Sequence, residues 1–102
     1  MRNVSQRSIE GKIKDCRRLI KPKEVISCLE ELLKATNDGI VAYELGHEYE
    51  KIGSKKNALE YYEQAESLFK QPIYKNMARA AINNLAIEAI VSTKRARRKL
   101  SK

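Results

Sequence analysis

Residues 42–72 read AYELGHEYEKIGSKKNALEYYEQAESLFKQP and carry the clearest structural pattern in the chain. Large and small residues recur at helical spacing on both sides of a central Gly-Ser pair. When two antiparallel helices pack, large side chains fill the space between the axes and small ones lie where the backbones come closest. The stretch therefore predicts a closely packed helix hairpin. Its packing residues are Leu45, Gly46, Tyr49, Ala58, Tyr62 and Ala65.

Local signals place the ends of these two helices. A glycine inside a helix costs about 1 kcal/mol relative to alanine, so Gly46 indicates that close packing offsets this loss. Gly53 is placed to end the first helix in a left-handed conformation. Ser54 is expected to cap the second by accepting a hydrogen bond from a backbone amide. We expect helices over 40–52 and 55–70. Their inward-facing residues are then Ala42, Leu45, Tyr49 and Ile52 on the first and Ala58, Tyr62, Ala65 and Phe69 on the second.

Helical spacing continues in both directions from the hairpin. A first amphipathic helix carries Ile9, Ile13, Cys16 and Ile20 at intervals of three and four residues. A second helix begins at Pro22, continues to about residue 35, and is separated from the hairpin by an Asn-Asp-Gly break. A last helix extends from about residue 73 into a basic tail. Because no strand is predicted, the fold class is all-α.

The last helix is apolar on two opposite sides. Its first side is expected to face the hairpin, but no later helix in this chain exists to cover the second. Two alternatives remain open: a second copy meets this side across a two-fold axis, or the first helix folds back over it. The first side consists of Tyr74, Ala78, Ala81, Leu85 and Ala89, and the second of Ala80, Ile87, Ile90 and Val91.

The hairpin residues resemble a tetratricopeptide repeat (TPR), in which Leu-Gly and Tyr on one helix precede Ala, an aromatic and Ala on the next, with a closing Pro. One well-matched repeat covers about 39–72, and its flanking repeats are partial or degenerate. The departures are Ala42, where the family favours Trp, and Pro72, two residues later than usual. The resemblance implies antiparallel hairpins stacked as a short TPR-like α-solenoid of about five helices. The alternative is an ordinary five-helix bundle.

The resemblance also implies a function. In the family, the first helices of successive repeats line a groove that receives a peptide or helix of another protein. It therefore predicts a non-enzymatic adaptor or scaffold. The alternative is that the matching positions are ordinary surface residues. These partner-binding candidates are Tyr43, His47, Glu50, Asn83, Ile87 and Ile90.

The formal net charge of +8 lies at the two ends of the chain. Residues 37–71 hold four basic and seven acidic groups, whereas residues 72–102 hold eight basic and one acidic. We expect a single helical domain over 1–93 and a basic tail over 94–102. Such a tail attracts phosphates, but a solvated helix end explains it equally well. Nucleic-acid contact through this tail is therefore one alternative function. Homo-oligomeric assembly through the second apolar side of the last helix is the other. The candidate nucleic-acid contacts are Lys94, Arg95, Arg97, Arg98 and Lys99.

The 102 residues suffice for one domain and offer little for catalysis. His47 is the one histidine, and there is no glycine-rich phosphate loop. We expect no enzyme activity, cofactor or metal. Cys16 and Cys28 lie at apolar helical positions, so we expect free thiols in a reducing cytoplasm. No segment predicts a membrane span or a signal peptide, so no membrane partner is expected.

Overall fold

The computed structural model describes the backbone of residues 4–100 and the side chains of residues 9–91. Within the described backbone every regular element is a helix, which confirms the all-α prediction. The elements are α1 (Val4–Arg17), α2 (Pro22–Thr36), α3 (Gly39–Lys51), α4 (Lys55–Leu68) and α5 (Pro72–Leu100).

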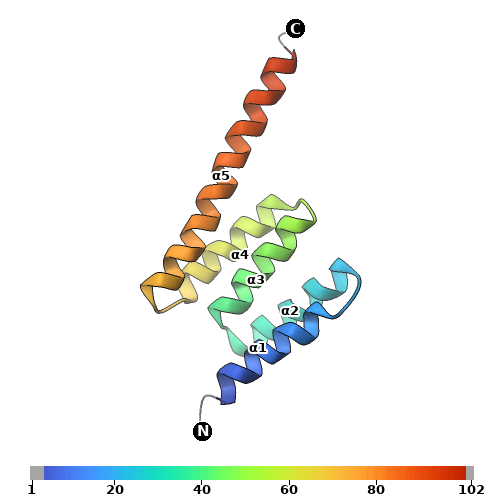
Figure 1. The fold of residues 1–102 in the computed structure, drawn as a ribbon, viewed down its shortest axis with the longest axis vertical. Helices are drawn as coiled ribbons and strands as arrows, with labels where there is room; N and C mark the ends of the chain where they lie inside the picture. The colour runs from blue at the N-terminus through green and yellow to red at the C-terminus, as the bar shows by residue number, and fades with distance from the viewer. Residues whose placement is uncertain (1–3, 101–102) are drawn as a thin grey trace.

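The helices lie in two layers (Figure 1). In that view α1, α3 and α5 lie in front, and the fainter α2 and α4 lie behind them. Each helix packs on the next one in the chain, and α3 and α4 form the central hairpin. The 29 residues of α5 span about 43 Å, twice the length of the 14-residue α4. The far end of α5 therefore projects beyond the body of the molecule.

The helix ends follow from local backbone conformation. Asn37 is left-handed (φ 51°) and ends α2. Asp38 caps α3, because its Oδ1 accepts a hydrogen bond from the Ile40 amide at 3.0 Å. Gly53 (φ 83°) ends α3 in the predicted left-handed conformation. The predicted Ser54 cap is wrong: its hydroxyl makes no cap bond and instead accepts the side-chain amide of Asn57 at 2.9 Å.

The core lies between the hairpin helices and their neighbours. A Cβ atom at Gly46 would lie 2.4 Å from Cε1 of Tyr62, so the α3 backbone rests directly on that ring. The close approach expected at Gly46 is therefore present, with an aromatic ring as its partner. The largest fully buried side chains are those of Leu29, Val41, Leu45 and Tyr62.

Two isoleucines expected in apolar stripes are exposed. Ile20 is 92% exposed because α1 ends at Arg17, three residues before the stripe would reach it. Ile52 is 47% exposed because α3 ends at Lys51. Both residues follow a helix end, so neither keeps the angular position that helical spacing would give it.

The two apolar sides of α5 have different surroundings. Ala78 and Leu85 are buried as expected, together with Ile82, whereas Tyr74 is half-exposed and stacks on Phe69. Ile87, Ile90 and Val91 on the opposite side are exposed. The alternative in which the first helix covers this side is wrong, because α1 packs on α2, on the far side of α3 from α5 (Figure 1).

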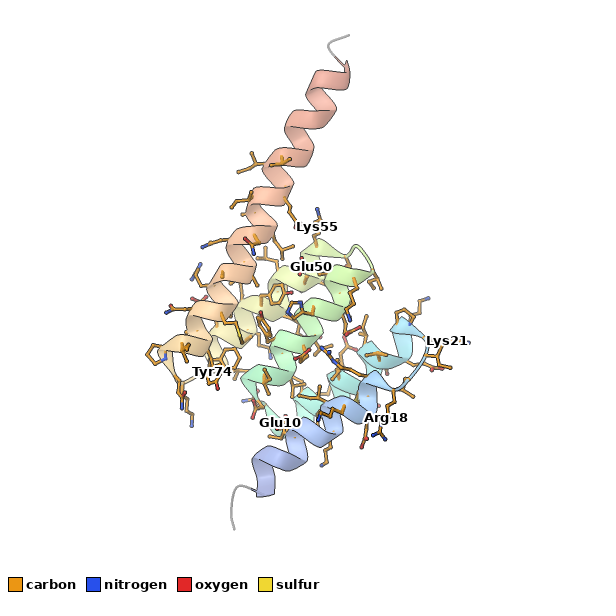
Figure 2. The ribbon with its side chains drawn as sticks, in the orientation of Figure 1. Glu10, Arg18, Lys21, Glu50, Lys55 and Tyr74 are labelled. Carbon is orange, nitrogen blue, oxygen red and sulfur yellow. A yellow bond between two sulfur atoms is a disulfide. The ribbon has the colours of Figure 1, made fainter. Side chains whose placement is uncertain are left out.

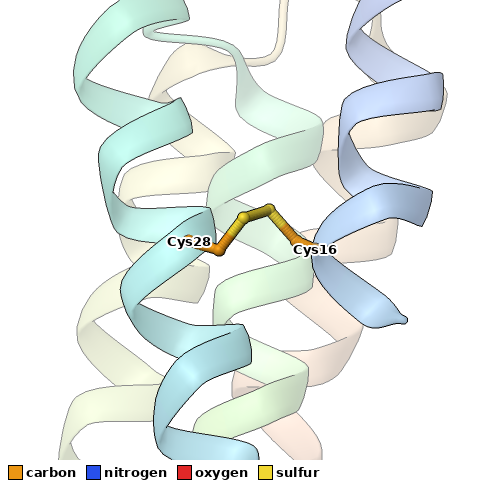
Figure 3. Close-up of a disulfide and its surroundings, with 2 residues drawn as sticks. All are labelled: Cys16 and Cys28. Carbon is orange, nitrogen blue, oxygen red and sulfur yellow. A yellow bond between two sulfur atoms is a disulfide. The ribbon is translucent and has the colours of Figure 1, made fainter. Parts of the chain in front are cut away.

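Cys16 and Cys28 form a disulfide with their Cα atoms 5.6 Å apart, which connects α1 to α2 (Figure 3). The prediction of free thiols is therefore wrong. Each cysteine does lie at an apolar position of its helix, but the α1–α2 hairpin places the two positions opposite each other. Because disulfides persist in oxidising compartments, the cytoplasmic expectation loses the argument based on reduced cysteines and stays a prediction.

Candidate partner-binding surface

Tyr62 connects the predicted α3 residues. From its buried position on α4, the phenol donates a hydrogen bond to Glu50 Oε1 at 2.6 Å and lies 3.2 Å from His47 Nδ1. Burial and the Glu50 hydrogen bond raise the pKa of Tyr62 far above 10, so it stays protonated. Tyr62 donates its single hydroxyl hydrogen to Glu50. In the second hydrogen bond, His47 Nδ1–H therefore donates to the Tyr62 hydroxyl oxygen.

Tyr43 and His47 lie one turn apart on the same face of α3. Their rings meet edge to face with centroids 4.7 Å apart. The Tyr43 ring also lies 5.5 Å from the Tyr62 ring, at a tilted angle. Three aromatic rings and the Glu50 carboxylate thus form one contact network. Tyr43, His47 and Glu50 each remain partly exposed at its edge.

The imidazole of His47 is neutral at physiological pH. Its pKa is lowered from 6.5, first by burial and then by the charges of Arg17 and Lys51. The carboxylates of Glu50 and Glu48 oppose this effect. A neutral imidazole with hydrogen on Nδ1 leaves Nε2 as a hydrogen-bond acceptor.

The surface on α3 borders α5. Tyr43 packs against the buried cluster that contains Ile82 and Leu85 of α5. The charge of Glu88 on α5 contributes to the raised pKa of Tyr62. Glu88 also pairs with Lys55 at the start of α4, with 3.5 Å between Oε1 and Nζ. Figure 2 shows Lys55 and Glu50 at the same end of the hairpin.

The predicted residues on α5 lie elsewhere. Asn83, Ile87 and Ile90 are exposed. They lie about 140°, 180° and 120° around the helix from Ala78, which is buried toward α4. Since α5 must direct Ala78, Ile82 and Leu85 inward, its opposite side cannot border α3. The structure therefore brings Tyr43, His47 and Glu50 together and places the α5 group on a separate face.

A second polar cluster, on the side of α2 and α4, was missed by sequence reasoning. Glu30 Oε2 accepts hydrogen bonds from Tyr49 at 2.7 Å and Tyr61 at 3.1 Å. The two rings stack with centroids 5.5 Å apart, and burial raises the pKa of each phenol to about 12. This cluster ties α2, α3 and α4 together. Tyr49 in the Leu-Gly-Tyr pattern was its one sequence signal.

Two open hollows lie away from the predicted surface. One, of about 560 Å³, lies where Ile9 and Glu10 of α1 meet the α2–α3 and α4–α5 turns, between Glu10 and Tyr74 (Figure 2). The other, of about 460 Å³, includes Glu30 and Tyr61. Neither is lined by the six predicted partner-binding residues. Sequence reasoning missed the first hollow because α1 and two turns that are distant in the sequence build it.

Some of the described basic residues near the start of the chain lie at one end of the α1–α2 hairpin. Arg18 and Lys21 lie at the α1–α2 turn, away from the projecting end of α5 (Figure 2). The tail residues Lys94, Arg95, Arg97, Arg98 and Lys99 lie outside the residues with described side chains. Among the described residues, no helix is both long and apolar enough to cross a membrane, and no three potential metal ligands gather.

Comparison of the chain with protein-family models, curated proteins and solved structures finds no match. The resemblance to tetratricopeptide repeats stays a prediction from the residues that carry it.

Proposed function

We propose that this chain is a non-enzymatic interaction module, a TPR-like adaptor or scaffold that binds a peptide or helix of another protein. The proposal includes a short solenoid built from successive hairpins. It is supported by the alternation of helices between two layers and by the contact of each helix with the next. The α1–α2 and α3–α4 pairs are then successive repeats, and α5 begins a third.

The observation that carries the proposal is the network held by Tyr62. It fixes Glu50 through Oε1 and His47 through Nδ1. We assign Glu50 Oε2, His47 Nε2 and the Tyr43 hydroxyl to the partner. Groups fixed before binding lose little conformational freedom when the partner arrives. A backbone N–H of an extended peptide would donate to Glu50 Oε2 or His47 Nε2. A backbone carbonyl of the peptide would accept from the Tyr43 hydroxyl.

A second candidate function is homo-oligomeric assembly through α5. Ile87 is 57% exposed and Ile90 56% exposed, and with Val91 they form an apolar stripe. A stripe of this kind is typical of an association surface. Binding to nucleic acid remains the third alternative, with only the charge of the tail in its favour.

The adaptor proposal is tested by selecting peptides from a random display library on the folded protein. The selected peptide is then titrated into isotope-labelled protein while the chemical shifts of the backbone amides and of the histidine ring are recorded. We expect the largest shifts between residues 43 and 50 and at the His47 ring. Shifts confined to the two hollows or to the outer face of α5 would contradict the assigned surface.

A further inference from the structure

Among the described residues, the first helix has the fewest buried side chains. Only Ile13 and Cys16 are buried among its described side chains, with Ile9 partly buried. In contrast, α2 buries five residues and α3 six. Gly11 lies exposed inside α1, where a glycine lowers helix stability by about 1 kcal/mol relative to alanine. Apolar packing alone therefore holds α1 only loosely.

Covalent and ionic contacts at the end of α1 add to this attachment. The disulfide joins Cys16, the penultimate residue of α1, to Cys28 across a sequence separation of 12. Closing a loop of this size restricts the undocked chain strongly. The neighbouring Arg17 contacts the Glu44 carboxylate and lies 4.0 Å from Glu48, both on α3. The bridge also holds Arg17 within reach of these carboxylates.

We propose that the Cys16–Cys28 disulfide is a redox-controlled latch: it keeps α1 docked on α2 and α3, and its reduction by a dithiol releases α1 while the remaining helices stay folded. The buried side of α2 and the carboxylates of α3 then become accessible. The argument for this latch does not rest on the partner-binding surface proposed above.

The exchange balances as an ordinary two-electron reaction. A thiolate of the reductant attacks the bridge at Cys28, the more exposed residue, while Cys16 is only 2% exposed. The sulfur–sulfur bond breaks, and Cys16 leaves as a thiolate that takes up a proton. The second thiol of the reductant loses its proton, attacks the mixed disulfide and releases Cys28, which is also protonated. The reductant ends as a disulfide, and the protein holds two thiols.

Contacts that do not involve α1 hold α2, α3, α4 and α5 together. The α3–α4 hairpin is held by the contact of Gly46 with Tyr62. Two hydrogen bonds from the Arg79 guanidinium to Glu66, at 2.9 and 3.0 Å, join α5 to α4. The second polar cluster joins α2 to both hairpin helices through Glu30. None of these contacts passes through α1, so local release is physically separable from global unfolding.

Amide hydrogen exchange tests the latch directly. The full chain is compared in air-oxidised form, after treatment with dithiothreitol, and as the Cys16→Ser/Cys28→Ser variant. We expect reduction to lower protection of residues 9–17 about 100-fold, the scale expected for a loop of this size, with protection in α3 and α4 unchanged. The double variant should match the reduced protein and show no response to dithiothreitol.

The His47 ring gives an independent readout. It faces Tyr43, Tyr62, Glu50, Glu48 and Lys51, all of which remain after α1 leaves, and Arg17, which departs. Because Arg17 lowers the pKa of His47, we expect the pKa measured by NMR to rise on reduction. Unchanged protection of α1, equal loss of protection in α3 and α4, or two free thiols in the air-oxidised protein would each overturn the latch.

Discussion

A single glycine and a single tyrosine set the spacing of the central hairpin. Gly46 has no side chain, and the Tyr62 ring occupies the volume that a Cβ atom would need. The ring cannot move aside easily, because it is fully buried and its hydroxyl is bound to Glu50 and His47. Tyr62, which packs against Gly46, therefore also positions the side chains of Glu50 and His47.

Replacing this glycine should destabilise the protein strongly. We expect Gly46→Ala to lower the free energy of unfolding by about 1 to 3 kcal/mol, because it overpacks a rigid buried site. Gly11→Ala is the matched control: no atom lies within 4 Å of the added Cβ, so helix propensity should raise stability by up to about 1 kcal/mol. Urea denaturation measures both. Equal stability of the two variants would show that Tyr62 does not occupy the space beside Gly46.

The stability of the fold should depend on pH through His47. Its pKa is below 6.5 in the folded protein, with burial as the main cause. Below pH 6.5 the unfolded chain therefore binds more protons than the folded one. The stabilising contribution is complete above pH 6.5 and decreases as the pH falls through and below this value. Denaturation at pH 7.5 and 5.5 should show this decrease for the wild type and a smaller one for His47→Gln.

Among the elements, the two hairpin helices could be predicted most fully from the sequence. The Leu-Gly-Tyr and Ala-Tyr-Ala spacings identified them, and Gly53 marked their turn. The ends of α1 and α3 were placed too late, because apolar spacing continues into Ile20 and Ile52 after the backbone has left the helix. The disulfide could not be predicted from apolar positions, since its formation depends on how two helices align.

The side chain of Asp38 caps α3, whereas that of Ser54 makes no cap bond on α4, and mutation can measure this difference. We expect Asp38→Ala to cost about 1 kcal/mol, because the Asp38 carboxylate caps α3 by accepting the Ile40 amide. Ser54→Ala should cost clearly less, since its hydroxyl caps nothing on α4 and bonds only Asn57. Chemical denaturation of the two variants gives the comparison. A larger loss for Ser54→Ala would contradict the described start of α4.

At the scale of the whole molecule, half of the predicted site could be assembled from the sequence. Tyr43, His47 and Glu50 share one face of α3 because they are spaced by four and three residues. The sequence could not show that Tyr62 engages two of them, since it belongs to another helix. The two apolar sides of the last helix already placed Ile87 and Ile90 opposite the hairpin, and the structure agrees with that pattern rather than with their assignment to a groove shared with α3.

Homo-oligomeric assembly through α5 predicts that the protein has a dimeric molar mass in solution. If α5 pairs with a second copy, the wild type should show a dimeric mass by light scattering, and Ile87→Asp should be monomeric. Ile52→Asp is the control, because Ile52 is similarly exposed but lies at the α3–α4 turn. A monomeric wild type would remove assembly through α5.

The most direct test of the partner-binding surface removes one hydroxyl from each of two tyrosines. Calorimetry would compare the affinity of the library-selected peptide for the wild type, Tyr43→Phe and Tyr61→Phe. We expect Tyr43→Phe to weaken binding about fivefold, the effect of one hydrogen bond, and Tyr61→Phe to leave it unchanged because its hydroxyl is bound to Glu30. Unchanged affinity for Tyr43→Phe together with unchanged affinity for His47→Ala would contradict the assignment of this surface to a partner.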